Sequence, residues 1–200
     1  MRRRAWLVGA ASAGGCSILP ARPYVEKREW PLDIRRPVAV PPAVGGKTLL
    51  VRTLRVAPGL EARGLQVVQG DGSVRTDYYE EWTVPPADAV EDVLRRWLAA
   101  SGLFSAVLAP GSRLRPDFAL EGELLALIAD PNTATSRAAL SFVVLDLRAA
   151  ASPRVLLQAE ETASAAITVA GPPGIAAAGQ AAVARLIAVV ERRISLSALR

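Results

Sequence analysis

Three long strand candidates follow one another in the second half of the chain, and this succession constrains the fold more than any other feature. The segments are residues 117–129, 137–148 and 154–168. In the first segment, apolar side chains alternate with the acidic Glu121 and Glu123, and the second segment is the most apolar. A period of two is typical of β-strands with one buried face. Because short turn-forming stretches connect the segments, we expect an antiparallel meander.

Earlier segments predict further strands. Residues 47–56 alternate apolar and polar side chains and predict one strand. Residues 64–68 and 73–83 flank Gln69-Gly70-Asp71-Gly72, where both glycines tolerate positive φ, so we expect a hairpin there. Residues 104–107 predict a short strand or a turn.

Two segments predict helices. Pro85-Pro86 opens a stretch with apolar residues at helical spacing that ends at Gly102: Val90, Val93, Leu94, Trp97 and Leu98. A second such stripe follows residues 171–174: Val183, Leu186, Ile187, Val190 and Ile194. Strands and helices in this order predict an α+β fold, in which a mainly antiparallel sheet carries two helices packed on one face.

The N-terminus has the organisation of a signal peptide. Three arginines are followed by an apolar stretch at residues 5–13 and then by small residues up to Cys16. The apolar stretch is shorter than the roughly 20 residues of a transmembrane helix. We therefore predict a signal peptide at residues 1–15, a lipidated cysteine and proline-rich tether at 16–44, and one domain at 45–200.

The residues around Cys16 indicate lipidation. Ala13-Gly14-Gly15-Cys16 resembles a lipobox, in which small residues admit the signal peptidase and diacylglycerol alkylates the thiol. Lipidation also explains an unpaired thiol in an exported protein. Ser17 in place of Asp favours the outer membrane by enterobacterial sorting. The alternatives are an ordinary cleaved signal with an incidental cysteine, or a misassigned start.

Composition excludes several classes of function. The chain has no histidine and one cysteine, so it lacks the usual general base and the usual transition-metal ligands. We expect no cofactor, no metal and no catalytic activity. Three of the five net positive charges are Arg2, Arg3 and Arg4, which the signal peptide removes, and the remaining +2 gives no reason to expect nucleic-acid binding.

The order of several motifs resembles one known family. The motifs are Val51-Arg52, residues 78–82 running into Pro85 and the first helix, residues 102–107, and residues 118–124. Together with Cys16, they make the chain similar to the ABC-type transport auxiliary lipoproteins, the PqiC-like group that accompanies MCE lipid-transport systems between two membranes. The resemblance implies a non-enzymatic, lipid-anchored protein of the periplasmic face. It implies MCE-domain and ABC permease or ATPase subunits as partners, and it leaves self-association open.

An aromatic-acidic segment is the candidate partner-binding site. Tyr78, Tyr79 and Trp82 combine apolar rings with polar tips, as interface residues commonly do. Alternation places Tyr78 and Trp82 on one strand face and Tyr79 on the other, so one face at most is available to a partner. Packing of one face under a helix is the simpler interpretation of each residue taken singly. Trp97 lies on an apolar helix stripe and is predicted to be in the core.

Two other functions remain open from the sequence. Glu121 and Glu123 lie on one strand face and could act as the carboxylate pair of a periplasmic hydrolase, although a solvated strand face explains them more simply. A structural lipoprotein that assists outer-membrane assembly would have a similar α+β domain.

Overall fold

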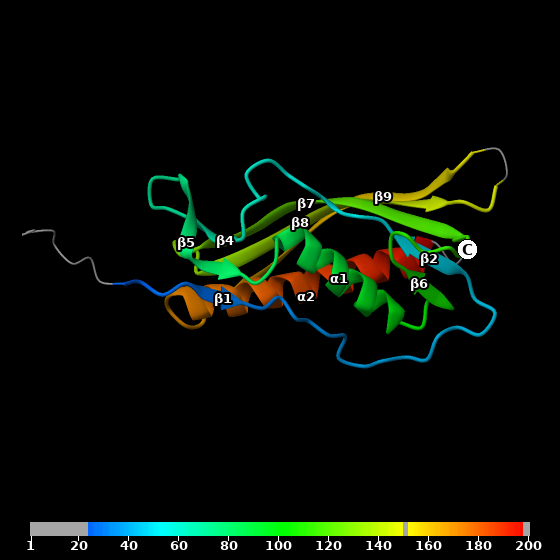
Figure 1. Ribbon diagram of the computed structural model, residues 1–200, viewed down its shortest axis with the longest axis horizontal. Coiled ribbons are helices and arrows are strands. Elements are labelled where there is room, and N and C mark those ends of the chain that lie inside the picture. The colour runs from blue at the N-terminus through cyan, green and yellow to red at the C-terminus, as the bar shows by residue number, and fades with distance from the viewer. Residues whose placement is uncertain (1–23, 150–151, 198–200) are drawn as a thin grey trace, which may run out of the picture.

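The computed structural model describes residues 24–149 and 152–197. Figure 1 shows a twisted sheet with two helices on one face and a long N-terminal segment running beneath the helices. The predicted signal peptide and Cys16 lie outside the described residues.

The three longest strands of the sheet form the predicted meander. They are β7 (Phe118–Asp130), β8 (Thr135–Asp146) and β9 (Arg154–Ala166), with β9 at one edge of the sheet. β8 pairs antiparallel with β7 along its whole length and with β9 on its other side. The predicted meander is therefore confirmed. Short turns favour antiparallel pairing between strands that follow one another in the chain.

The edge of β7 opposite β8 forms parallel pairs instead of antiparallel ones. Three short strands lie along it one after another, all parallel to it: β2 (Thr48–Val51), β3 (Arg55–Val56) and β4 (Gly64–Val68). β6 (Ala106–Leu108) pairs parallel with β2 on its far side. The predicted single strand 47–56 is thus two strands, because the Leu54 amide donates to Glu91 Oε2 of helix α1 (Pro86–Ala99; 3.0 Å) and Leu54 is buried.

The prediction of a mainly antiparallel sheet is wrong. Of the eight strand pairings among the described residues, five are parallel and three are antiparallel, so the sheet is mixed. Parallel pairing needs a long crossover connection, and the chain between β4 and β7 provides one that includes α1. Alternation of side chains is the same in both kinds of pair and could not distinguish them.

The remaining strands form one end of the sheet. β4 pairs antiparallel with β5 (Val74–Trp82), which confirms the predicted hairpin, with a register shift between Gly64 and Gln66. β1 (Arg28–Trp30) adds a parallel strand to the outer edge of β5, opposite residues 80–82.

Both helices cover the same face of the sheet, as predicted (Figure 1). α1 (Pro86–Ala99) begins directly after Pro85, and α2 (Pro172–Ser197) begins at Pro172. Pro is favourable at such starts, because the N–H group that it lacks would have no intrahelical partner there. The predicted apolar stripes of both helices, including Trp97, are buried against the sheet. α2 is long and apolar enough to span a membrane by length and composition alone. Since its apolar side chains form the core, we interpret α2 as a core helix.

The N-terminal proline-rich segment is packed on the domain. We call residues 31–43 the strap. Leu32 and Ile34 are buried, and Arg36 donates to both carboxylate oxygens of Glu191 on α2 (3.1 and 3.2 Å). Further along, the Val40 amide donates to the Ala100 carbonyl at the end of α1 (2.9 Å). The strap therefore crosses both helices. The boundary between tether and domain, at residue 44, remains a prediction.

Candidate docking surface

The segment Tyr78–Trp82 divides into an exposed part and a buried part. The side chains of Tyr78 and Tyr79 are 69% and 41% exposed, whereas Trp82 is 3% exposed. Trp82 packs against Gly179 of α2, where an added Cβ would meet its ring at 3.1 Å. Strict alternation would place Tyr78 and Trp82 on one face. The structure instead separates them, so only the two tyrosines are available to a partner.

Asp77 explains why the alternation fails. Its Oδ1 accepts hydrogen bonds from the amides of Tyr79 (2.9 Å) and Glu80 (3.2 Å), which bends the strand at this point. Partial burial opposes ionisation of Asp77, but the Tyr79 amide and the Arg75 guanidinium outweigh burial and lower its pKa. β5 also shifts register against β4 over this stretch, and beyond the shift Glu80, Glu81 and Trp82 are all buried.

The two tyrosine rings form a compact exposed unit. They meet edge to face with their centroids 5.1 Å apart. The Lys27 Nζ lies 4.2 Å from the centroid of the Tyr78 ring, at cation–π distance. We call Tyr78 and Tyr79 the tyrosine pair; both rings are exposed to solvent, while the Lys27 ammonium lies between the Tyr78 ring and Glu81. Such a combination suits a protein partner, because it offers apolar area and hydrogen-bonding tips at a low entropic cost.

Two buried carboxylates, each paired with partly exposed cations, hold the strands beneath the tyrosine pair. Glu80 accepts from the guanidinium of Arg28 and from Trp30 Nε1 (2.9 Å). Glu81 accepts from Arg63 Nη2 (2.6 Å) and lies 3.5 Å from Lys27 Nζ. These carboxylates bind β1 to β5 and are already occupied. Sequence analysis missed the contributions of residues 27–30, because 50 or more residues separate each contact pair along the chain.

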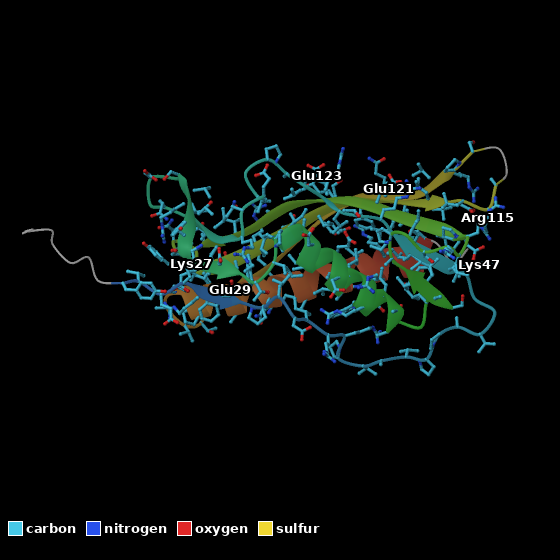
Figure 2. All side chains as sticks on the ribbon, in the orientation of Figure 1. Lys27, Glu29, Lys47, Arg115, Glu121 and Glu123 are labelled. Atoms are coloured by element: carbon cyan, nitrogen blue, oxygen red, sulfur yellow. The ribbon has the colours of Figure 1, made fainter. Side chains whose placement is uncertain are left out.

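Glu121 and Glu123 lie on the face of the sheet that the helices leave open, where Figure 2 labels them. Each carboxylate pairs with an arginine from the β2–β3 region: Glu121 with Arg52 and Glu123 with Arg55 (3.2 Å). They line an open hollow of about 400 Å³. Its walls are mixed charged and neutral side chains, including Ser141 and Gln158. Each of these two carboxylates is thus engaged by a guanidinium, an arrangement that gives no specific support to the hydrolase alternative.

Metal binding gains no support from the described residues. Within 24–149 and 152–197, no three histidine, cysteine, aspartate or glutamate side chains gather in a way that could hold a metal ion.

Comparison with known proteins decides the family. The family model described as "ABC-type transport auxiliary lipoprotein component" matches residues 31–190. The chain belongs to this family. The match includes the strap, both helices and the meander, and it relates the protein to an ABC-type transport system and to lipoproteins, which associate with the cell envelope. A comparison with curated proteins finds no match.

Solved structures share the fold at low sequence identity. Protein XCC0632 from Xanthomonas campestris, of family DUF330, is 20% identical with a TM-score of 0.64, over 78% of this chain and 90% of that one. An uncharacterized protein is 12% identical with a TM-score of 0.62, over 84% and 99%. The hypothetical protein CT253 from Chlamydia trachomatis is 12% identical with a TM-score of 0.52, over 76% and 99%. At this identity the likeness concerns the fold alone.

Proposed function

We propose that this protein is a lipid-anchored, non-enzymatic accessory component of an ABC/MCE-type lipid-transport system, and that it acts by binding its partners at the periplasmic face of the envelope. The observation that carries the proposal is the family match over residues 31–190. The anchor is the acylated thiol of Cys16, most simply in the outer membrane. Two or more acyl chains are sufficient for stable attachment, since each buried methylene contributes about 0.8 kcal/mol.

Anchoring explains how a small docking surface would suffice. Tyr24, the first described residue, is eight residues after Cys16. Even a fully extended chain would therefore separate the two residues by about 29 Å at most. A domain held so close to a membrane meets membrane-bound partners at a high effective concentration. Moderate intrinsic affinity at one surface is then enough.

We propose that the tyrosine pair is this docking surface and that its partner is an MCE-domain or ABC permease subunit. The support is the exposure of both rings above a network of ion pairs that holds their backbone in place. Trp82, the third residue predicted to bind a partner, is buried and can contribute only by supporting the strand.

Recovery of partners from solubilised envelopes tests the docking surface. With the full chain as bait, we expect MCE or ABC subunits to be recovered, and the double variant Tyr78→Ala/Tyr79→Ala to lose most of them. The matched control is Leu196→Ala, which removes an equally exposed apolar side chain from α2 (64% exposed). Failure of the wild type to recover any such subunit overturns the transport role. Recovery of outer-membrane assembly factors instead would favour the structural alternative.

Metabolic labelling with a palmitate analogue tests the anchor separately. Wild type should carry the label and fractionate with membranes. Cys16→Ala should lose the label, and label that persists in this variant would contradict anchoring through the thiol.

A further inference from the structure

Charges are balanced over the described residues but unevenly distributed. All 19 aspartate and glutamate residues lie between Glu26 and Glu191. Five of the 24 lysine and arginine residues lie outside the described residues: Arg2, Arg3, Arg4, Arg22 and Arg200. The described part therefore carries 19 charges of each sign and is neutral overall. Any strongly basic region in it must be offset by an acidic excess elsewhere.

One end of the sheet gathers such a basic region. Strand register aligns Leu49 of β2 with Phe118 of β7, Phe118 with Asp146 of β8, and Asp146 with Arg154 of β9. The segments around these positions therefore meet at one end of the molecule. They bring together five basic residues, which we call the basic tip: Lys47, Arg113, Arg115, Arg148 and Arg154. Figure 2 labels Lys47 and Arg115 at this end, and Lys27 and Glu29 toward the opposite end.

Two carboxylates lie within the basic tip and are already occupied. Asp117 accepts from the amide of Thr48 (2.8 Å), which lowers its pKa, with further lowering by Lys47 and Arg148. Asp146 accepts from Arg148 (2.7 Å), the main cause of its lowered pKa, and lies 3.7 Å from Arg154. Both carboxylates therefore remain ionised at neutral pH, and the tip keeps a net charge of +3.

The remaining cations of the tip face solvent without a partner. Lys47, Arg113 and Arg115 are exposed, and none of them forms an ion pair within residues 24–149 and 152–197. In contrast, the basic residues near the tyrosine pair are bound to carboxylates. An exposed cation without an internal partner contributes little to folding, but it attracts an anionic ligand.

A leucine at the basic tip indicates what kind of ligand. Leu114 lies between Arg113 and Arg115 in the loop from β6 to β7 and is 62% exposed. The loop turns at Gly111, which has a φ of +85°. An apolar side chain flanked by arginines suits a bilayer surface: guanidinium groups bind phosphates while the leucine enters the headgroup region. A bilayer surface accommodates the charges and the exposed leucine together, and we therefore take it as the ligand.

We infer that the basic tip binds anionic phospholipid headgroups at a bilayer surface. This contact goes beyond the proposed function, because it is made by the folded domain itself and needs neither the acyl chains on Cys16 nor the tyrosine pair. It lies at the end of the domain away from Lys27 (Figure 2).

Vesicle co-sedimentation of the mature chain, residues 16–200, carrying Cys16→Ala tests this contact without the signal peptide or the acyl anchor. The probes are vesicles of phosphatidylcholine alone and of phosphatidylcholine mixed with phosphatidylglycerol. We expect binding to the anionic vesicles that weakens as salt is raised. Arg113→Glu/Arg115→Glu should lower the partition coefficient at least tenfold, since each basic residue near an anionic surface contributes about fivefold. Leu114→Asp should lower it by a smaller factor.

The matched control is Arg35→Glu/Arg137→Glu, which makes the same change in net charge at exposed sites outside the tip. It should bind anionic vesicles like the parent protein, and the N-terminal segment is identical in every variant. Equal binding to both vesicle types, or equal loss in the tip and control variants, overturns the inference. So does a tip variant that keeps vesicle binding but loses an envelope protein in the pull-down, which would identify an acidic protein as the ligand. The tyrosine-pair variants report on the proposed function independently.

Discussion

The two ends of the sheet use their charged residues in opposite ways. At the end that carries the tyrosine pair, Glu80 and Glu81 are buried and paired with Arg28, Arg63 and Lys27. At the basic tip, three cations have no ion-pair partner among the described residues, and the two carboxylates are held by their own neighbours. The first end uses charge to fix β1 and β5 to each other, and the second leaves charge available for a ligand.

The difference shows that net charge is a poor guide to function in this protein. Averaged over the described residues, the chain is neutral, and a judgement from composition alone finds no basic surface. In the folded protein, ion pairs neutralise the charged side chains at the tyrosine-pair end, whereas cations without an ion pair among the described residues gather at the basic tip. Substitutions of the same kind should therefore have large effects on stability at the tyrosine-pair end and small ones at the basic tip.

Removing a large side chain gives the strongest contrast. Trp82→Ala should lower the free energy of unfolding by about 3–5 kcal/mol, because it leaves a cavity between β5 and α2. Leu114→Ala at the tip should change it by less than about 0.5 kcal/mol. Urea denaturation followed by circular dichroism measures both. Similar values for the two variants would mean that the ends do not differ in packing.

Glycine substitutions give the next contrast. A Cβ at Gly64 would lie 2.1 Å from the Asp77 carbonyl oxygen across the β4–β5 pair, whereas a Cβ at Gly111 meets nothing within 4 Å. Gly64→Ala should cost about 3 kcal/mol, because backbone must move. Gly111→Ala should cost about 1 kcal/mol, from its positive φ alone. A mild Gly64→Ala would show that the hairpin end can adjust.

Charge removal separates the ends by a smaller amount. Glu81→Gln weakens the contacts of Glu81 with Arg63 and Lys27 and should cost about 1–2 kcal/mol, since the carboxylate is buried but both cations are partly exposed. Arg115→Gln should leave stability within about 0.5 kcal/mol of wild type. Thermal melts of both variants at low and high salt provide the measurement, and a destabilised Arg115→Gln would indicate an unrecognised structural role.

The pH dependence gives the smallest expected effect. The pKa of Asp146 is lowered in the folded state, so its contribution is present above its unfolded pKa of about 3.9 and is lost as the pH falls below that value. Asp146→Asn should be less stable than wild type at neutral pH and should lose less stability between about pH 5 and pH 2. Parallel acid-unfolding curves for the two proteins would contradict this assignment.

The local predictions held where neighbours in sequence are neighbours in space. The meander, the β4–β5 hairpin and both helices follow from periodicity, prolines and turn residues, which act over a few positions. The prediction of a mainly antiparallel sheet failed, because β2, β3 and β4 pair with β7 from 60 to 70 positions away and nothing in their alternation encodes direction. Tyr78 is exposed and Trp82 buried across a register shift of β5 next to Asp77, which a strict period of two does not anticipate.

By itself, the sequence determined the helices, the meander, the absence of histidine chemistry and the resemblance to one family, since each depends on residue type and short-range spacing. Only the tertiary structure decided that the sheet is mixed, that the strap crosses both helices and that Trp82 is buried while the tyrosine pair is exposed. It alone showed that five basic residues from four separate segments form one tip. Side-chain exposure and charge pairing depend on which distant segments meet, and that is a property of the folded chain.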